Sequence, residues 1–439
     1  MVISTKLGKI EGVDFDTCIE YRKVPYAKPP VGDLRWKAPV PVEPWEGTLD
    51  ATKYGNRCMA CDLADAFYGK EFYDNPAFAR TMGEDCLYIN IWTPKDYKDK
   101  KYPVAFWIHG GAFASGYATE KEFDGKAFCE RGVILVSVEY RCNIFGFFAH
   151  PWLNEENPEH ISGNYGIYDQ ICALKWVYDY IEAFGGDPEN ITIFGQSAGA
   201  MSVQTLVSTK LTGNMIAKAI MQSGGSYATG LHTDISLKQQ EAYGEEFVKM
   251  MHVHSLAELR SKSAEEIIAT HKPLMDLLMP RVHGLYHAPT IDGKLLDDTY
   301  YHIMDKGEIK DIPYMLGSTK NDIMTTPEMV KKGEYSDLYK GVISFSHKLE
   351  ELNRKPAYTY YFKHNLPGDD MGAWHSSELW YMFGTLDRCW RDFTEKDRAL
   401  SKEMLDYWTN FMKTGDPNGE GLEEWRACSK ENSFIKVFE

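Results

Sequence analysis

Short apolar runs recur along the chain between polar and turn-forming segments. Residues 104–108 and 133–138 are almost continuously apolar, and residues 87–92 alternate in the manner of a strand. Near-continuous apolar runs of this kind are typical of strands that are buried on both faces of a parallel sheet. We expect further strands at residues 190–194, 217–221, 313–316 and 358–362.

Helical periodicity is found between the expected strands. In residues 167–184 the apolar side chains recur every three or four positions, and the glycine- and proline-containing residues 185–189 follow. The spacing places the apolar side chains on one face of a helix, and the glycine and proline residues end it. Strands that alternate with helices favour an α/β fold with a mostly parallel central sheet and helices on both of its faces.

Residues 231–310 differ from the rest of the chain because their patterns are mainly those of helix and loop. Residues 239–251 and 263–279 have helical spacing. We expect this segment to be a helical insertion that caps the carboxyl edge of the sheet, where open α/β folds have their pockets. No internal repeat, low-complexity tract or linker divides the sequence, so we predict a single domain over residues 1–439.

The composition narrows the classes of partner. Lys and Arg number 48 and Asp and Glu number 64, so the net charge is −16, and a surface of that sign repels phosphate backbones. No apolar run reaches the length of a membrane span, and the N-terminal residues lack the apolar segment of a signal peptide. We therefore expect a cytoplasmic protein that binds neither nucleic acid nor a membrane.

The nine cysteines are an odd number, and most of them lie in apolar surroundings. Buried, reduced thiols are the expected state in the cytoplasm. Cys58, Cys61 and Cys86 are the exception because they could bracket a loop. A Cys58–Cys86 disulfide is the alternative that this spacing leaves open.

One apolar, β-branched run leads directly into a G-x-S-x-G sequence, Gly195-Gln-Ser197-Ala-Gly199, and small residues that can begin a helix follow it. A strand, a very tight turn and a helix expose a serine hydroxyl at the top of a sheet, in a nucleophile elbow. Glycine is required at 195 and 199 because a Cβ at either position would collide with the neighbouring strand or helix. Ser197 is therefore a candidate nucleophile for acyl transfer.

A serine nucleophile needs hydrogen-bond donors aimed at the oxyanion that forms on the substrate. The sequence His109-Gly-Gly-Ala-Phe113 follows the strand expected at 104–108, and its glycines let successive N–H groups turn toward one point. We expect the N–H groups of Gly111 and Ala112, together with that of Ala198, to be the donors.

Several segments resemble, in order, those of type B carboxylesterases, the α/β-hydrolase family that includes the para-nitrobenzyl esterases and the cholinesterases. Besides the elbow and the glycine loop they are EDCLYINIW at 84–92, NYGIYDQ at 164–170, FGGDP at 184–188, PTIDG at 289–293 and WTNFMKTGDPN at 408–418. The resemblance covers nearly the whole chain. It implies an α/β-hydrolase fold and a serine ester hydrolase.

The resemblance also implies the two partners of Ser197. His375, which Glu378 follows three residues later, matches the family's base, and Asp322 falls at the position of its acid. The family has glutamate there, so the acid of this chain is shorter by one methylene, about 1.5 Å, and Ile323 replaces the family's usual glycine. Aspartate orients the base in many triads, and the chain order of serine, acid and histidine is that of α/β-hydrolases.

Other interpretations of these residues stay open at the level of the sequence. Asp322 could be a solvated loop acid, with Glu308 or Glu328 as rivals for its role. Ser223 resembles a serine that holds the acid in the family. Three aromatic residues could line the acyl or alcohol pocket, although core packing explains such residues equally well; they are Phe113, Tyr117 and Trp374.

Together, the nucleophile, the base, the acid and the oxyanion donors predict a two-step hydrolysis of small, fairly apolar carboxylic esters through an acyl-enzyme, with no metal or organic cofactor. The spacings of His252 with His254 and of His283 with His287 could suit a metal, but no carboxylate or cysteine pattern supports them. The open alternatives are an amidase, a feruloyl-type esterase, a lipase-like enzyme and a non-catalytic, cholinesterase-like binding protein.

Overall fold

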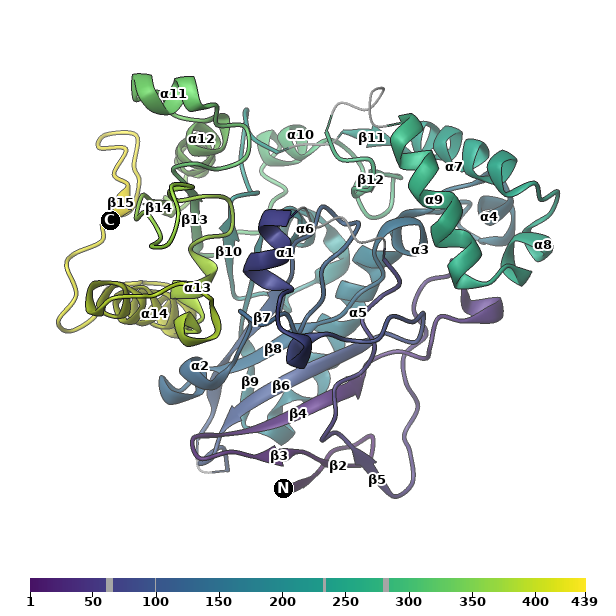
Figure 1. The fold of residues 1–439 in the computed structure, drawn as a ribbon, viewed down its shortest axis with the longest axis horizontal. Coiled ribbons are helices and arrows are strands. Elements are labelled where there is room, and N and C mark those ends of the chain that lie inside the picture. Colours follow the sequence, from purple (N-terminus) through teal and green to yellow (C-terminus); the bar gives the residue numbers. More distant parts are fainter. Residues whose placement is uncertain (61–65, 99, 232–233, 279–283) are drawn as a thin grey trace.

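The protein is built around one sheet of ten strands, in the order β15-β14-β13-β10-β9-β7-β8-β6-β4-β3 (Figure 1). The structure is a computed structural model that describes residues 1–60, 66–98, 100–231, 234–278 and 284–439. The strands are β3 (Val13–Asp14), β4 (Cys18–Pro25), β6 (Tyr88–Pro94), β7 (Tyr102–Ile108), β8 (Ile134–Val138), β9 (Gly186–Gln196), β10 (Lys218–Gln222), β13 (Tyr314–Thr319), β14 (Tyr358–Phe362) and β15 (Lys436–Phe438).

The sheet is mostly parallel, as the apolar runs predicted. All pairings from β8 through β7, β9, β10, β13 and β14 to β15 are parallel. Only the edge formed by β6, β4 and β3 is antiparallel. Each of the seven predicted strands is present, and β4, β3 and β15 are the strands of this sheet that the sequence pattern did not predict.

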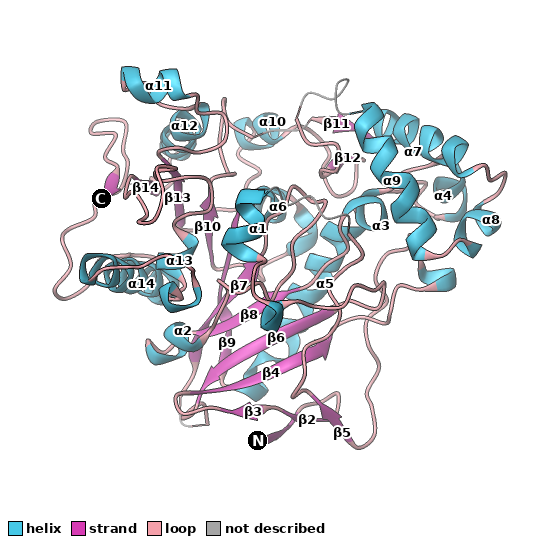
Figure 2. Cartoon of the chain, viewed as in Figure 1, coloured by secondary structure: helices cyan, strands magenta, loops and turns pink. Residues whose placement is uncertain are grey.

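Helices cover both faces of the sheet (Figure 2). Alternate side chains of β7 enter different cores: Val104, Phe106 and Ile108 pack with α5 (Tyr165–Tyr180), α6 (Ala198–Ser208) and α12 (Asp337–Glu351). Ala105 and Trp107 pack with α2 (Lys126–Glu130), α13 (Leu379–Met382) and α14 (Glu395–Thr414). Because successive side chains of a strand point to opposite faces, one apolar run supplies both cores.

The strand register brings the expected functional segments to one edge of the sheet. Ile108, the last residue of β7, pairs with Gly195 of β9. On the other side of β9, Gln196 pairs with Gln222, the last residue of β10, which in turn pairs with Gly317 of β13. The chain therefore leaves four neighbouring strands at the same carboxyl edge, where ligands bind in open α/β sheets.

Two smaller sheets and several short helices complete the fold. One sheet joins β1 (Val2–Ser4), β2 (Lys9–Glu11) and β5 (Thr48–Asp50), and the other joins β11 (Ile235–Ser236) and β12 (Thr290–Ile291). The remaining α-helices are α1 (Ala66–Phe72), α3 (Asn143–Phe147), α4 (Pro151–Glu156), α7 (Leu237–Met251), α8 (Leu256–Ser261), α9 (Ala264–Leu278), α10 (Tyr300–Asp305) and α11 (Pro327–Lys332). Turns of 3₁₀-helix span Gly32–Leu34, Pro76–Phe78, Ile181–Phe184, Lys210–Thr212 and Leu386–Arg388.

The segment predicted to be a helical insertion contains α7 and α9 close to their expected bounds, although Met279 lies outside the described residues. Together with α8 these helices share a separate core with α3 and α4, and they lie together at the right of Figure 1. The role of this segment as a cap on the carboxyl edge, within a single domain, stays a prediction. None of the described helices combines the length and apolarity needed to cross a membrane.

The described cysteines are free thiols, most of them buried. Cys58 and Cys86 are both among them, so the structure does not contain the alternative disulfide. Cys61, the third cysteine of that group, lies outside the described residues.

Candidate active site

Ser197 occupies a strained turn between β9 and α6. Its backbone has φ 57° and ψ −125°, in the left-handed region that non-glycine residues rarely adopt. A Cβ on Gly195 would lie 2.5 Å from the backbone of Gly199, and a Cβ on Gly199 would lie 2.1 Å from the carbonyl oxygen of Ile108. Glycine is therefore required at both positions for the steric reason that the sequence predicted, because the helix crosses the strands at contact distance.

The turn places Ser197 directly before the amino end of α6. Ala198 is the first residue of this helix, so its N–H group has no acceptor within the helix. The peptide dipoles of α6 add partial positive charge at the same point. This end of α6 is therefore suited to stabilise an anion beside Ser197.

The glycine loop after β7 packs against the elbow. Gly111, Ala112 and Phe113 have φ angles of 101°, 55° and 56°, so three successive residues are left-handed. A Cβ on Gly110 would lie 2.9 Å from the carbonyl oxygen of Gln196 and 3.2 Å from Cβ of Ser197. The loop and the serine therefore lie in direct contact, as an oxyanion site requires.

Hydrogen bonds hold the glycine loop in this conformation. The N–H groups of Ala114 and Ser115 donate to the carbonyl oxygen of Gly111, at 2.9 and 3.0 Å, and that of Asn143 donates to Phe113 at 2.6 Å. Within the described chain, no hydrogen bond is donated by the N–H groups of Gly111 and Ala112. Both groups are therefore available to a ligand.

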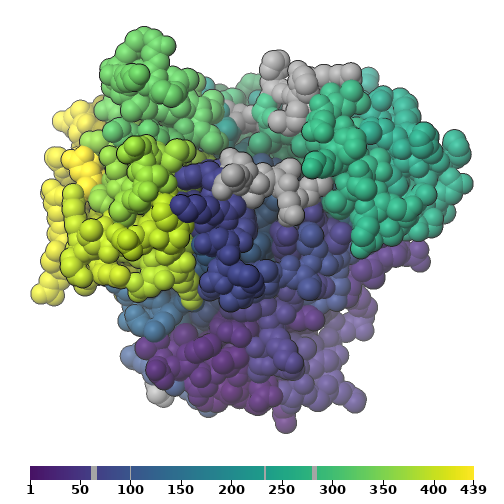
Figure 3. Space-filling view, in the orientation of Figure 1, coloured from purple at the N-terminus to yellow at the C-terminus, as the bar shows by residue number. Residues whose placement is uncertain are grey.

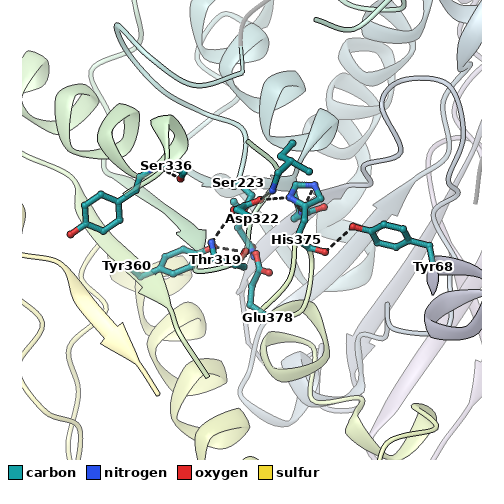
Figure 4. Close-up of polar contacts among 12 residues, drawn as sticks. Tyr68, Ser223, Thr319, Asp322, Ser336, Tyr360, His375 and Glu378 are labelled. Atoms are coloured by element: carbon teal, nitrogen blue, oxygen red, sulfur yellow. Dashed lines mark hydrogen bonds and ion pairs between the residues drawn. The ribbon is translucent and has the colours of Figure 1, made fainter. Parts of the chain in front are cut away.

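Asp322 joins His375 to Ser223 in one buried chain of hydrogen bonds (Figure 4). Nδ1 of His375 lies 2.5 Å from Oδ1 of Asp322, and the Ser223 hydroxyl donates to Oδ2 at 2.7 Å. The N–H groups of Thr319 and Ile323 each donate to this carboxylate at 2.9 Å. Burial disfavours the imidazolium, but the charge of Asp322, its hydrogen bond to the ring and the charge of Glu378 together outweigh burial and raise the pKa of His375.

The shorter acid reaches the histidine because the two loops that carry them pair with each other. Asn321 forms a β-bridge with Trp374, and its N–H donates to the carbonyl oxygen of Ala373 at 2.8 Å. Oδ1 of Asn321 accepts from the N–H of Ala373 at 3.1 Å and would lie 2.5 Å from a Cβ on Gly372. The two loops are thus in contact one residue before Asp322 and one before His375.

The rival acids lie elsewhere. The Glu328 side chain is 75% exposed and pairs with Lys332 at 2.7 Å. Glu308 is also on the surface, 3.7 Å from Lys210. Neither is bonded to His375, so the structure favours Asp322 as its partner.

Gln196 is a residue of the site that the sequence reasoning did not single out. It is buried, and its Nε2 lies 3.1 Å from Nε2 of His375. Within the described chain, no hydrogen bond joins Ser197 to His375. The structure thus brings His375, Asp322 and Ser223 together and places Ser197 against the glycine loop, with Gln196 between the two groups. The position of Gln196 next to Ser197 in the sequence is the signal that could have identified Gln196 as a residue of the site.

Glu378 is a second carboxyl near the acid. It is fully buried and accepts hydrogen bonds from Nε2 of Gln222 at 3.3 Å and from the Tyr360 hydroxyl at 3.4 Å. Burial and the nearby charge of Asp322 raise its pKa to about 7. The spacing of Glu378 from His375 is visible in the sequence, but its burial depends on packing between distant segments.

The three aromatic residues proposed for the pocket are all buried. Trp374 packs against a group on α1, with ring centroids 5.1 Å from Phe67, 5.8 Å from Tyr68 and 5.6 Å from Phe72. Tyr68 also donates to the carbonyl oxygen of His375 at 3.2 Å. The space-filling view shows α1 in the middle of this face, between the segment of α13 and α14 and that of α7 to α9 (Figure 3).

Phe113 and Tyr117 likewise have partners in the core. The Phe113 ring lies 5.1 Å from that of Phe147, and the Tyr117 hydroxyl donates to the carbonyl oxygen of Phe78 at 3.2 Å. A contact of these rings with substrate stays a prediction.

The histidines with metal-like spacing do not form a larger cluster in the described part of the chain. No group of three His, Cys, Asp or Glu side chains placed to hold a metal is found there. Nε2 of His287 instead lies 2.6 Å from Nε2 of His271, and His283 lies outside the described residues.

Comparison with known proteins gives full-length matches. A family model described as the carboxylesterase family matches residues 1–340 and 335–437. The para-nitrobenzyl esterase of Bacillus subtilis (strain 168) is 32% identical over 474 residues, which cover 98% of this chain and 93% of that protein. The cocaine esterase of Homo sapiens is 30% identical over 481 residues, covering 94% and 82%. A solved PNB esterase has a TM-score of 0.86 at 29% identity and covers 100% of this chain, which covers 96% of it.

Proposed function

Since the chain belongs to the carboxylesterase family, has its α/β-hydrolase fold and is a serine ester hydrolase, we propose that Ser197 is its nucleophile, His375 its base and Asp322 the acid that orients the base. The single observation that carries this assignment is the 2.5 Å contact between Nδ1 of His375 and Oδ1 of Asp322 at the carboxyl edge that also holds the strained Ser197.

In the first step, Oγ of Ser197 attacks the carbonyl carbon of the ester, and its proton passes to Nε2 of His375. Asp322, which accepts the Nδ1–H, stabilises the imidazolium that forms. The N–H groups of Gly111, Ala112 and Ala198 receive the oxyanion of the tetrahedral intermediate. Each such donor typically contributes about 3–4 kcal/mol to the transition state.

The intermediate then collapses. The bond from the carbonyl carbon to the alcohol oxygen breaks, His375 gives its proton to that oxygen, and the acyl group remains on Ser197. In the second half of the reaction, water gives a proton to His375 and attacks the acyl carbon. Ser197 leaves with that proton, and the carboxylic acid is released.

We assign small, fairly apolar carboxylic esters as substrates, with Phe113, Tyr117 and Trp374 near the reacting groups. Aromatic surfaces around the base, such as the group of α1 rings on Trp374, support this choice. The names of two relatives, a para-nitrobenzyl esterase and a cocaine esterase, are consistent with this choice. A cytoplasmic location belongs to the same proposal, supported by the free thiols of the described cysteines.

The test is hydrolysis of p-nitrophenyl butyrate by the purified protein and by Ser197→Ala. We expect the substitution to lower kcat by roughly 10⁴–10⁶-fold. Ser208→Ala, a buried serine at the far end of α6, is the matched control and should keep its rate. Mass spectrometry after treatment with a fluorophosphonate should find the label on Ser197. An active Ser197→Ala variant, or a label elsewhere, would contradict the assignment.

A further inference from the structure

His375 lies in a tight turn of four residues, from Trp374 to Ser377. The N–H of Ser377 donates to the carbonyl oxygen of Trp374 at 3.0 Å and closes the turn. Of the two central residues only Ser376 has a positive φ, 79°, which is the pattern of a type II turn. The base is therefore carried by the second residue of a type II turn.

A serine at position 376 does not favour this turn. Type II turns usually have glycine or asparagine there, since other residues are strained at a positive φ. A type I turn suits serine better, and it differs mainly in the peptide between the two central residues, which faces the opposite way. The carbonyl group of that peptide belongs to His375, so the direction of this carbonyl group decides which turn forms.

The hydroxyl of Tyr68 holds this carbonyl group in place. It donates to the carbonyl oxygen of His375 at 3.2 Å (Figure 4). Among the described residues, no other group donates a hydrogen bond to this oxygen. The bond would be lost if the peptide turned over, because the oxygen would then face away from the hydroxyl. The contact therefore favours the type II form of the turn that carries the base.

The helix α1, on which Tyr68 lies, is anchored to the chain on both sides of His375. The side chain of Glu71 on α1 is fully buried and pairs with Arg391 at 2.5 Å. The guanidinium of Arg391 also donates to the carbonyl oxygen of Pro367 at 2.6 Å. One buried arginine thus joins α1 to the segments that precede and follow the base, and the Tyr68 hydroxyl is held at a fixed place relative to the turn.

We propose that Tyr68 is a positioning residue: by donating to the carbonyl oxygen of His375 it keeps the turn in its type II form and so holds the imidazole toward Asp322. This inference rests on the proposed function. A peptide that turns over changes ψ of His375 by about 150°. The contact of 2.5 Å between the ring and Asp322 leaves little room for the displacement that follows.

The experiment measures kcat and KM for p-nitrophenyl butyrate in the wild type, Tyr68→Phe, Ser376→Gly and the variant with both substitutions. Phenylalanine keeps the ring that packs on Trp374, at 5.8 Å, and removes only the hydroxyl. We expect Tyr68→Phe to lower kcat by roughly three- to tenfold, as the loss of one hydrogen bond does, and to change KM by less than about twofold.

The glycine variants distinguish the positioning of the turn from a general weakening of the structure. Glycine adopts a positive φ without strain, so a turn with glycine at 376 does not depend on the hydroxyl. In the Ser376→Gly background, the loss of the Tyr68 hydroxyl should therefore change kcat by less than about twofold. A general weakening would lower kcat by the same factor in both backgrounds.

Tyr407→Phe is the matched control, because the hydroxyl of Tyr407 on α14 also donates to a main-chain carbonyl oxygen, that of Glu423, at 2.6 Å. This variant should keep the kcat of the wild type. Chemical denaturation checks that each variant folds. If Tyr68→Phe folds only together with Ser376→Gly, a double variant that is slower than Ser376→Gly by about threefold or more is sufficient to reject the inference.

The outcomes separate this inference from the proposed function. An inactive Ser197→Ala variant together with a wild-type kcat in Tyr68→Phe, or with an equal loss of kcat in both backgrounds, would overturn the role of Tyr68 alone. An active Ser197→Ala variant would overturn the proposed function itself.

Discussion

Asp322 is shorter by one methylene than the glutamate expected at its position, yet both of its oxygens are fully engaged. Oδ1 contacts His375 and accepts from the N–H of Ile323, and Oδ2 accepts from Ser223 and Thr319. The two loops are held together by the hydrogen bonds between Asn321 and Ala373. The site is therefore built for aspartate, and a longer acid would displace four partners.

We predict that Asp322→Asn lowers kcat by roughly 10³–10⁴-fold, because the amide cannot stabilise the imidazolium. Asp322→Glu is expected to lose about tenfold, since its extra methylene, about 1.5 Å, has no space between the paired loops. Steady-state kinetics with p-nitrophenyl butyrate measure both. A glutamate variant as fast as the wild type would show that the loops adapt freely to either acid.

Among the elements, α6 depends on its one glycine, Gly199, for its contact with the sheet. A Cβ on Gly199 would lie 2.1 Å from the carbonyl oxygen of Ile108, and that oxygen belongs to the central strand β7, which cannot shift cheaply. We predict that Gly199→Ala destabilises the protein by about 3 kcal/mol or more and abolishes hydrolysis, because α6 carries Ala198 and follows Ser197 directly.

The matched control is Gly69→Ala on α1, where a Cβ would meet nothing within 4 Å. Alanine is the better helix former, so this variant should be unchanged or stabilised by about 0.5–1 kcal/mol. Chemical denaturation followed by circular dichroism measures both variants. Equal free energies of unfolding for Gly199→Ala and the wild type would mean that α6 is not held against β7 in solution.

The sequence predicted those elements whose signal is local. The runs that became β7 and β8 are buried on both faces, so their composition alone identified them. The strand β4 contains charged residues such as Glu20 and Arg22, and its place in the sheet depends on pairing with β6. Tyr68 and Gln196 escaped for the same reason, since their contacts with His375 join segments far apart in the chain. Glu378 was part of the histidine motif, but its burial also depends on such contacts.

Across the whole molecule, stability is linked to pH through carboxyl groups buried between the layers. Burial raises the pKa of Glu139 to about 8 and, with the charge of Asp322, that of Glu378 to about 7. Asp397 differs, because hydrogen bonds from Thr394, Tyr381 and His364 outweigh its burial and lower its pKa to about 2. Its contribution is present at neutral pH and is lost as the pH falls toward that value.

The carboxyl groups with a raised pKa change the stability with pH in the opposite direction. A carboxyl whose pKa is higher in the folded protein holds its proton more tightly when folded, so it stabilises the fold at low pH, and this contribution is lost as the pH rises through the folded-state pKa. For Glu378 the loss begins near its unfolded value of about 4.3 and is complete above about 7. The protein should therefore be most stable at mildly acidic pH.

We predict that Glu378→Gln, which keeps a hydrogen-bond acceptor for Gln222 and Tyr360 without the charge, removes part of this dependence. At pH 8 its free energy of unfolding should exceed that of the wild type by about 3 kcal/mol, and at pH 5 by much less. Thermal melts from pH 5 to 8 measure the difference, and Glu328→Gln, at an exposed glutamate, is the control that should follow the wild type. Parallel curves for Glu378→Gln and the wild type would mean that the protonation of Glu378 does not change on unfolding in this range. The alkaline loss of stability would then arise from other buried carboxyl groups with a raised pKa, such as Glu139 and Glu122, or from the repulsion of a net charge of −16.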